Sequence, residues 1–308
     1  MDGTKQIGDT HPIDFLPPPG GYRALYFDLD GTLLDPRSKL DPTTLQMLHR
    51  LMAEGIRVGI ATGRMYHSAA PYIRQVGCNA PLILFNGARI NRAGRDEAHV
   101  QHRLGRQTAR LVIERARNQH VHVNLYHEHR YFMDSDDPHG RAFIAKEHFM
   151  PVMVPDLTDM LEQDPVKLLL IADPERLADV RPELERLTAG QATLVSSEPE
   201  FLEVLPAGIS KGRALHEVAA IMHITVEQIV AFGDGPNDAD MLEVAGLGVA
   251  MGNARESVIQ AADVRTASNA DRGVALALSR IFPWLEETSS PNQSDHGDAR
   301  QRIEKEPR

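Results

Sequence analysis

The stretch YFDLDGTLL, residues 26–34, places two carboxylates, Asp28 and Asp30, one residue apart at the end of an apolar run. In an extended backbone, residues i and i+2 point to the same side, so the two carboxylates can converge on one point. Such a pair suits a hard cation such as Mg²⁺, whose charge offsets their mutual repulsion. The alternative is a solvated turn, which the Asp30-Gly31 dipeptide alone would also favour. The stretch predicts a buried strand that ends either at a cation site or at such a turn.

Outward from this stretch, short apolar runs alternate with helical segments. Strands are predicted at residues 23–27, 57–61, 81–85, 228–232 and 248–251. Helices are predicted to begin at Asp41-Pro42, at Ser210 and at Ala239, and Thr225 to Gln228 reads as a capping box. Strands separated by helices imply right-handed crossovers and a parallel sheet covered on both faces. The predicted fold class is α/β, with a doubly wound, Rossmann-like core that binds ligands at the carboxyl ends of its strands.

Residues 90–205 follow a different pattern and are predicted to form an inserted α+β cap module. The segment VHVNLYHEHRYFMD, from Val121, indicates two strands around a His-Glu-His turn, and further strands are expected at 167–172 and 201–205. A helix is expected after Asp173, interrupted or split at Pro182 because proline breaks the hydrogen-bond ladder of a helix.

The chain therefore divides into four predicted parts. The core is assembled from two separate segments, residues 21–89 and 206–285, on either side of the cap. The leader, 1–20, and the tail, 286–308, are polar and are predicted to be disordered.

The composition excludes several classes of protein. A formal net charge of -10 argues against a nucleic-acid or membrane-surface binder, since both need clustered Lys and Arg. Cys78 is the single cysteine, which excludes a disulfide within the chain and fits a reducing compartment. No signal peptide is recognisable, and no apolar run approaches the ~18 residues of a membrane span. We therefore expect a soluble, cytoplasmic protein.

Two further clusters follow predicted strands but are ambiguous alone. The hydroxyl of Thr62 and the backbone N–H of Gly63 could cradle a phosphate at a strand end; alternatively, Thr62 only caps a helix that begins near Arg64. Lys211 lies at the start of a helix, where the helix dipole disfavours a cation. Either Lys211 pairs with an anion there, or it is an ordinary surface lysine.

A fourth cluster, GDGPND at residues 233–238, offers oxygen ligands. Asp234, Asn237 and Asp238 lie in a loop shaped by glycine and proline after the strand at 228–232, and their oxygens suit a cation. The alternative is a turn that caps the following helix. Together the four clusters would put a nucleophile, a second acid, a hydroxyl, a lysine and metal carboxylates at one edge of the sheet.

These motifs resemble those of haloacid dehalogenase superfamily phosphatases, in the Cof-type branch with a large α/β cap inserted after the second motif. The four motifs are DLDGTL (28–33), ATGR (61–64), ISKG (209–212) and GDGPNDADML (233–242). FNGARI (85–90), GVAMGNA (248–254) and NADRGVA (269–275) are also similar to that branch. The resemblance covers roughly residues 22–283. The cap matches weakly, and in this family the cap selects the substrate.

The resemblance implies a role for each motif residue. Asp28 would attack phosphorus and become an aspartyl-phosphate, and Asp30 would protonate the leaving group and then deprotonate the hydrolytic water. The phosphoryl oxygens would be held by the side chains and backbone groups of these residues: Thr62, Lys211, Asn237, Leu29 and Gly63.

A magnesium site is also implied by the resemblance. Mg²⁺ would be bound by Asp28, by the backbone carbonyl of Asp30 and by Asp234. Asp238 would be an additional ligand or one outside the inner coordination sphere. An aspartate at position 30 favours hydrolysis of the phosphoenzyme, since ion-pump relatives with a threonine there keep it longer.

The leading hypothesis is a Mg²⁺-dependent phosphatase of small metabolites, with sugar phosphates as the expected substrates. Its partner would be a small phosphate ester rather than a nucleic acid or a membrane, and the oligomeric state is left open. Two alternatives remain. One is a sugar phosphomutase of the same superfamily, and the other is a non-catalytic, phosphate-binding regulator.

Overall fold

The computed structural model describes residues 5–6, 17–147 and 149–285. Most of the predicted disordered leader, and all of the predicted tail from residue 286, lie outside these residues. Within the leader, however, Lys5–Gln6 forms β1, a strand at the edge of the large sheet. The prediction of disorder is wrong for these two residues, because their backbone pairs with β15 (Val264–Arg265).

Six parallel strands form the sheet of the first module, in the order β1-β15-β14-β13-β2-β3. The four longer strands are β2 (Ala24–Phe27), β3 (Arg57–Ile60), β13 (Ile229–Gly233) and β14 (Leu247–Ala250). Their residues are nearly all buried, as expected of a parallel sheet covered on both faces. The predicted doubly wound α/β core is confirmed.

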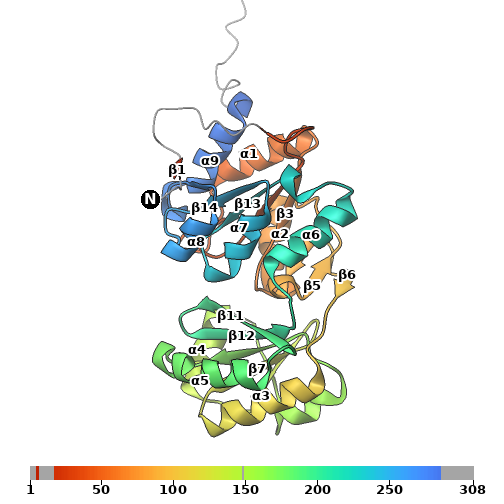
Figure 1. The fold of residues 1–308 in the computed structure, drawn as a ribbon, viewed down its shortest axis with the longest axis vertical. Coiled ribbons are helices and arrows are strands. Elements are labelled where there is room, and N and C mark those ends of the chain that lie inside the picture. Colours follow the sequence, from red (N-terminus) through yellow and green to blue (C-terminus); the bar gives the residue numbers. More distant parts are fainter. Residues whose placement is uncertain (1–4, 7–16, 148, 286–308) are drawn as a thin grey trace, which may run out of the picture.

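Helices cover both faces of this sheet (Figure 1). On the face that carries Phe27 and Phe232 lie α1 (Pro42–Ala53), α2 (Tyr66–Val76) and α9 (Gly273–Ile281). On the face that carries Tyr26 and Ala231 lie α6 (Lys211–Met222), α7 (Ala239–Val244) and α8 (Glu256–Ala261). Because neighbouring strand residues point to opposite faces, each strand contributes to both cores.

The helix starts follow from local sequence. Asp41 accepts a hydrogen bond from the backbone N–H of Thr44 at 2.8 Å, with Pro42 at the first helical position of α1. Ser210 caps α6 by accepting from the N–H of Arg213 at 3.1 Å. The capping box at Thr225 is formed as well. These predicted starts are confirmed.

A small antiparallel sheet adjoins β3 through a bridge between Ala61 and Ile83. Its strands are β4 (Leu82–Leu84), β5 (Arg89–Asn91) and β6 (Ala98–Gln101). The predicted start of the cap, residue 90, falls inside β5. This strand pairs with β4 and not with any strand of the second six-stranded sheet. The division into a core of residues 21–89 and 206–285 and a cap of residues 90–205 stays a prediction.

The second large sheet, hereafter the cap sheet, has the order β11-β12-β10-β7-β8-β9. Its pairs are antiparallel except for β8 with β9. Its strands are β7 (His122–Tyr126), β8 (Tyr131–Met133), β9 (Val152–Met153), β10 (Lys167–Ile171), β11 (Ala192–Glu198) and β12 (Phe201–Pro206). The hairpin predicted around the His-Glu-His turn is confirmed by the pairing of β7 with β8.

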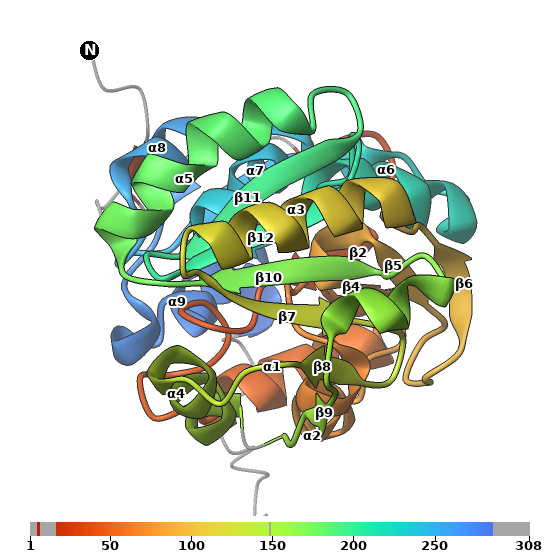
Figure 2. The ribbon, with the colours of Figure 1, turned by 90° about the horizontal axis from the view of Figure 1, so that it is seen from below.

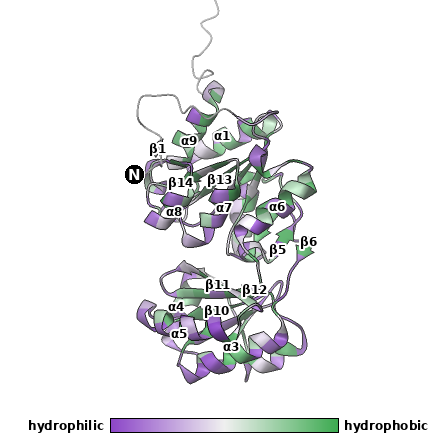
Figure 3. Cartoon of the chain, viewed as in Figure 1, coloured by the Kyte–Doolittle hydropathy of each residue, from purple (hydrophilic) through white to green (hydrophobic). Residues whose placement is uncertain are grey.

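Alternate residues of the cap sheet face opposite ways. Leu168 and Leu170 pack with α3 (Arg106–Asn118) and α5 (Pro174–Leu187), and Figure 2 shows these helices across the sheet face that points away from the core. Lys167 and Leu169 lie on the other face, toward the core strand ends. A third helix of this module, α4 (Pro138–Glu147), lies beside that face. In Figure 3 the outer helices carry hydrophilic residues beside hydrophobic ones.

Helix α5 continues through Pro182, so the predicted interruption is wrong. Proline removes one backbone hydrogen bond and crowds the preceding turn. Leu177, Val180 and Leu184 nevertheless bury against the cap sheet, and this packing holds the two halves of the helix in line. Within the part of the chain that the structure describes, no helix has both the length and the apolar character that a bilayer span requires.

Candidate active site

The site lies where three neighbouring core strands end. Phe27, the last residue of β2, is in register with Phe232 of β13 and Ile60 of β3. The residues that follow each strand therefore meet at one edge of the sheet. These are the aspartates after β2, the Thr62 loop after β3 and the Asp234 loop after β13, as the sequence predicted.

A buried lysine joins two of the aspartates. The Nζ atom of Lys211, at the start of α6, donates to Asp28 Oδ1 and to Asp238 Oδ1, both at 2.6 Å. The Lys211 side chain is 0% exposed, so the reading of an ordinary surface lysine is wrong. Burial alone would lower the pKa of Lys211, but Asp238 and Asp28 outweigh burial and raise it. Lys211 is therefore a fixed positive charge behind Asp28.

Asp234 is oriented from the side of the β2 loop. Thr32 Oγ1 donates to Asp234 Oδ1 at 2.6 Å, and Asn253 Nδ2 lies 3.3 Å from Asp234 Oδ2 and donates to the carbonyl of Gly31 at 2.8 Å. Gly31 has φ of +82°, and a Cβ there would lie 2.2 Å from Asp234 Oδ2. Only glycine allows the loop after Asp30 to approach Asp234 this closely.

Asp28, Asp234 and Asp238 each offer one carboxylate oxygen to a common point, and these oxygens lie within 4.8 Å of one another. Burial, followed by the charge of Asp238, raises the pKa of Asp234 to about 7. Burial also raises the pKa of Asp28 well above its ordinary value, although Lys211 opposes the rise. Three carboxylates can carry more negative charge than the single Lys211 ammonium neutralises, and their oxygens are hard donors. Such a group fits a divalent cation such as Mg²⁺.

Asp30 lies outside this group and pairs with Arg64. Arg64 Nε and Nη2 donate to Asp30 Oδ2 and Oδ1, each at 2.7 Å. The Asp30 side chain is 46% exposed, so it faces the opening rather than the buried carboxylates. The two aspartates of the DLD motif therefore occupy different environments, one buried with Lys211 and one at the mouth.

Of the remaining predicted residues, Thr62, Gly63 and Asn237 line the same opening, whereas the Leu29 side chain is buried in the core. No hydrogen bond from the backbone N–H of Leu29 or Gly63 to another described residue is found. Thr62 Oγ1 accepts from the N–H of Arg64 at 3.2 Å, but α2 begins only at Tyr66. Thr62 thus stabilises a turn and is not the residue that caps α2. The phosphate cradle at Thr62 and Gly63 stays a prediction.

Asn86 was not among the predicted site residues. It lies in the left-handed region with φ of +53°, and its Oδ1 accepts from Asn237 Nδ2 at 3.0 Å. Its own Nδ2 is buried and has no hydrogen-bond partner among the described residues. A strained backbone and an unpartnered donor next to Gly63 are typical of a functional position. The FNG segment was visible in the sequence, but nothing in it indicated that Asn86 points to the strand ends.

A cavity of about 310 Å³ lies between the core strand ends and the cap sheet. Its core side is polar and includes Asp28, Asp30 and Thr62. Its cap side holds a group of rings, hereafter the aromatic wall: Tyr126, Tyr131, Phe143, Phe149 and Phe201.

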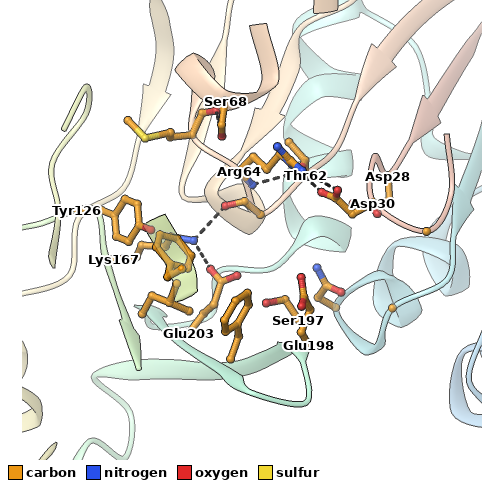
Figure 4. Close-up of a pocket in the computed structure, with 18 of the residues that line it drawn as sticks. Asp28, Asp30, Thr62, Arg64, Ser68, Tyr126, Lys167, Ser197, Glu198 and Glu203 are labelled. Carbon is orange, nitrogen blue, oxygen red and sulfur yellow. Dashed lines mark hydrogen bonds and ion pairs between the residues drawn. The ribbon is translucent and has the colours of Figure 1, made fainter. Parts of the chain in front are cut away.

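A buried ion pair lies on the cap side of the cavity, and its lysine contacts the Thr62 loop (Figure 4). Lys167 Nζ lies 2.5 Å from Glu203 Oε2 and donates to the carbonyl of Gly63 at 3.0 Å. Both side chains are buried, and the ammonium also lies 4.9 Å from the ring centroid of Tyr126. Neither residue was predicted. The alternation of β10 and β12 could have indicated that a lysine and a glutamate face the same side as Leu169.

Comparison with known proteins agrees with this geometry. A family model described as haloacid dehalogenase-like hydrolase matches residues 25–278, which is most of the chain. The chain belongs to the haloacid dehalogenase-like hydrolases. The predicted family and the predicted enzyme class, a hydrolase of this family, are therefore confirmed.

Two named relatives and one solved structure illustrate the similarity. The chain is 33% identical over 233 residues to an HMP-PP phosphatase of Cronobacter sakazakii, covering 76% of this chain and 85% of that protein. It is 32% identical over 260 residues to the 5-amino-6-(5-phospho-D-ribitylamino)uracil phosphatase of Bacillus subtilis, covering 83% and 96%. A haloacid dehalogenase-like hydrolase of Bacteroides thetaiotaomicron has a TM-score of 0.77 at 30% identity, covering 85% and 100%.

Proposed function

We propose that the chain is a Mg²⁺-dependent phosphatase that hydrolyses small phosphorylated metabolites in the cytoplasm. The observation that carries the proposal is the buried pairing of Asp28 with Lys211 beside Asp234 and Asp238, at the carboxyl edge of the core sheet. The named relatives support it, since both are phosphatases.

The donor set suits Mg²⁺. Asp28, Asp234 and the backbone carbonyl of Asp30 would hold the ion, with Asp238 as an additional ligand or one outside the inner coordination sphere. When bound, Mg²⁺ supplies the positive charge that lets a carboxylate approach a phosphate dianion.

Asp28 is the nucleophile in this proposal. Lys211 holds one Asp28 oxygen, which orients the carboxylate toward the cavity. A carboxylate oxygen of Asp28 attacks phosphorus in line, and the bond from phosphorus to the ester oxygen breaks as the aspartyl-phosphate forms. The Thr62 hydroxyl, Asn237 and the N–H groups of Leu29 and Gly63 would hold the phosphoryl oxygens during the transfer.

Asp30 is the proton carrier. A proton on Asp30 passes to the leaving oxygen, and the resulting carboxylate then takes a proton from the water that attacks the aspartyl-phosphate. Inorganic phosphate leaves, and Asp28 is restored. Both Asp30 oxygens accept from Arg64 in the structure, so the side chain must turn from Arg64 before it can carry a proton. Its exposure leaves room for that rotation.

The test is hydrolysis of acetyl phosphate by the purified protein, followed as phosphate release with Mg²⁺ or with EDTA. We expect release only with Mg²⁺, and a loss of about 10³-fold or more in Asp28→Asn, which removes the nucleophile. Asp179→Asn, which alters an exposed carboxylate on α5, is the matched control and should keep full activity. Mg²⁺-independent release, or an active Asp28→Asn protein, would contradict the proposal. With glucose 1-phosphate as the substrate, isomerised sugar phosphate without released phosphate would instead indicate a mutase.

A further inference from the structure

The cap side of the cavity has an unusual composition for this chain. Aromatic residues are 5% of the sequence, with nine phenylalanines, six tyrosines and one tryptophan. Five of them form the aromatic wall, although they come from four separate strands and helices and one connecting segment. A scarce residue type gathered over one cavity, opposite the predicted nucleophile, indicates what kind of group the cavity accepts.

The rings of the aromatic wall hold one another in position. Tyr126 stacks on Tyr131 with centroids 5.4 Å apart and an interplanar angle of 18°. Phe143 meets the edge of Tyr131 at 5.6 Å and that of Phe201 at 5.7 Å, and Phe149 lies 5.9 Å from Tyr131. A surface that is ordered before the ligand arrives loses little entropy on binding. Tyr126, Tyr131 and Phe143 are buried and support the wall from behind, and the half-buried rings of Phe149 and Phe201 are left to pack against another planar ring.

Most hydrogen-bonding groups on this side already have partners within the protein. Lys167 is committed to Glu203 and to the Gly63 carbonyl, and Glu198 pairs with Lys146 at the rim. Among the described residues, Glu203 Oε1 and the Ser197 hydroxyl have no hydrogen bond assigned and line the cavity. A sugar would bring several hydroxyls to this side and leave most of them without partners, which costs binding free energy. A ring with one polar substituent avoids this cost.

We propose that the leaving group of the natural substrate carries a planar aromatic or heteroaromatic ring, which packs against the aromatic wall while its phosphate lies at Asp28. This inference rests on the proposed function, and it replaces the expectation of sugar phosphates. Ring recognition and phosphoryl transfer then occupy opposite sides of one cavity, the first on the cap and the second on the core.

Three phosphate esters of primary alcohols test the proposal with the Mg²⁺-loaded enzyme. Benzyl phosphate has a planar ring, cyclohexylmethyl phosphate has a ring of the same size that is not planar, and glucose 6-phosphate has a polar ring. We expect kcat/KM for benzyl phosphate to exceed the other two by about tenfold. Equal values for benzyl and cyclohexylmethyl phosphate, or a preference for glucose 6-phosphate, would overturn the proposal.

Variants of the aromatic wall provide the second arm. Phe201→Leu should lower kcat/KM for benzyl phosphate about fivefold and leave that for acetyl phosphate, which has no ring, nearly unchanged. Phe132→Leu is the matched control, since Phe132 packs with the helices on the opposite face of the cap sheet. Equal losses on both substrates in Phe201→Leu would refute a ring-binding role. If the wild-type enzyme does not hydrolyse acetyl phosphate, the proposed function itself is refuted. If it hydrolyses acetyl phosphate but shows no preference for benzyl phosphate over the other two esters, only this inference is refuted.

Discussion

The crowding of carboxylates around Asp28 predicts that Mg²⁺ and protons compete for the same site. Because the pKa of Asp234 is raised to about 7, the folded protein without metal binds a proton that the unfolded chain, with an ordinary carboxyl pKa, does not bind near neutral pH. Between these two pKa values the stability of the metal-free protein should fall as pH rises, by up to about 1.4 kcal/mol per pH unit for one proton. Above pH 7 Asp234 is ionised, so its repulsion with the neighbouring carboxylates is fully present. A bound cation should relieve this repulsion.

The magnitude of the Mg²⁺ effect follows from this competition. A ligand at 100 times its Kd stabilises the folded state by about 2.7 kcal/mol, which raises Tm by about 5–10 °C in a chain of this size. With the pKa of Asp234 at about 7, the ionised fraction falls about tenfold between pH 8 and pH 6, and the same Mg²⁺ concentration then contributes only about 1.4 kcal/mol. The shift in Tm should therefore be roughly halved at pH 6.

Thermal melts with and without Mg²⁺ at pH 8 and pH 6 measure both effects. Asp234→Asn removes one charge of the cluster, so we expect a protein that is more stable than wild type at pH 8 without metal and that no longer responds to Mg²⁺. Asp179→Asn should behave as wild type, because its carboxylate is exposed on the cap. Equal Mg²⁺ stabilisation at both pH values, or a full Mg²⁺ response in Asp234→Asn, would refute the reasoning.

Three further predictions test other parts of the site. Asp30→Asn should lower kcat/KM, which reports the steps up to the aspartyl-phosphate, by about 10²–10⁴-fold on an alkyl phosphate but much less on p-nitrophenyl phosphate, whose leaving group needs no proton; equal losses in kcat/KM would exclude proton donation to the leaving group by Asp30. Gly31→Ala should abolish the Mg²⁺-dependent rise in Tm, because its Cβ would displace Asp234; an unchanged Mg²⁺ titration would contradict this. Lys167→Met should lower the free energy of unfolding in urea by about 3–5 kcal/mol, because it leaves Glu203 buried and unpaired, and adding Glu203→Met should recover most of the loss. Additive losses in the double variant would mean that the pair is not coupled.

The core and its motif residues could be predicted because each follows a strand whose end is marked in the sequence. An apolar run, followed by acids, glycine and a helix start, fixes both the element and the edge of the sheet where Asp28, Thr62 and Asp234 lie. The burial of Lys211 was only one of two readings, because a helix start can face solvent or the sheet. Its contacts with Asp28 and Asp238 depend on how α6 packs, which no local pattern encodes.

The cap side of the site could not be predicted for a different reason. Tyr126 and Phe201 are 75 positions apart in the printed sequence, and they share a cavity only because the cap sheet has the order β12-β10-β7. Strand order in an antiparallel insertion is set by tertiary packing rather than by the pattern within each strand. Pro182 gives the same lesson, since packing of α5 on the cap sheet overrides a strong local preference against a continuous helix.

Lys167 links the two sides of the site. Its ammonium lies 4.9 Å from the ring centroid of Tyr126 in the aromatic wall, and it also donates to the carbonyl of Gly63, whose neighbour Thr62 is predicted to hold the phosphate. Since Lys167 and Glu203 are both buried, this contact exists only while the cap sheet lies against the Thr62 loop. A leaving group that packs on the wall therefore favours the same arrangement that holds the loop in place. If the proposed ring site and phosphate site are right, selection of the leaving group and positioning of the phosphate are both linked to the Lys167–Glu203 pair, because Lys167 contacts Tyr126 on one side and Gly63 on the other.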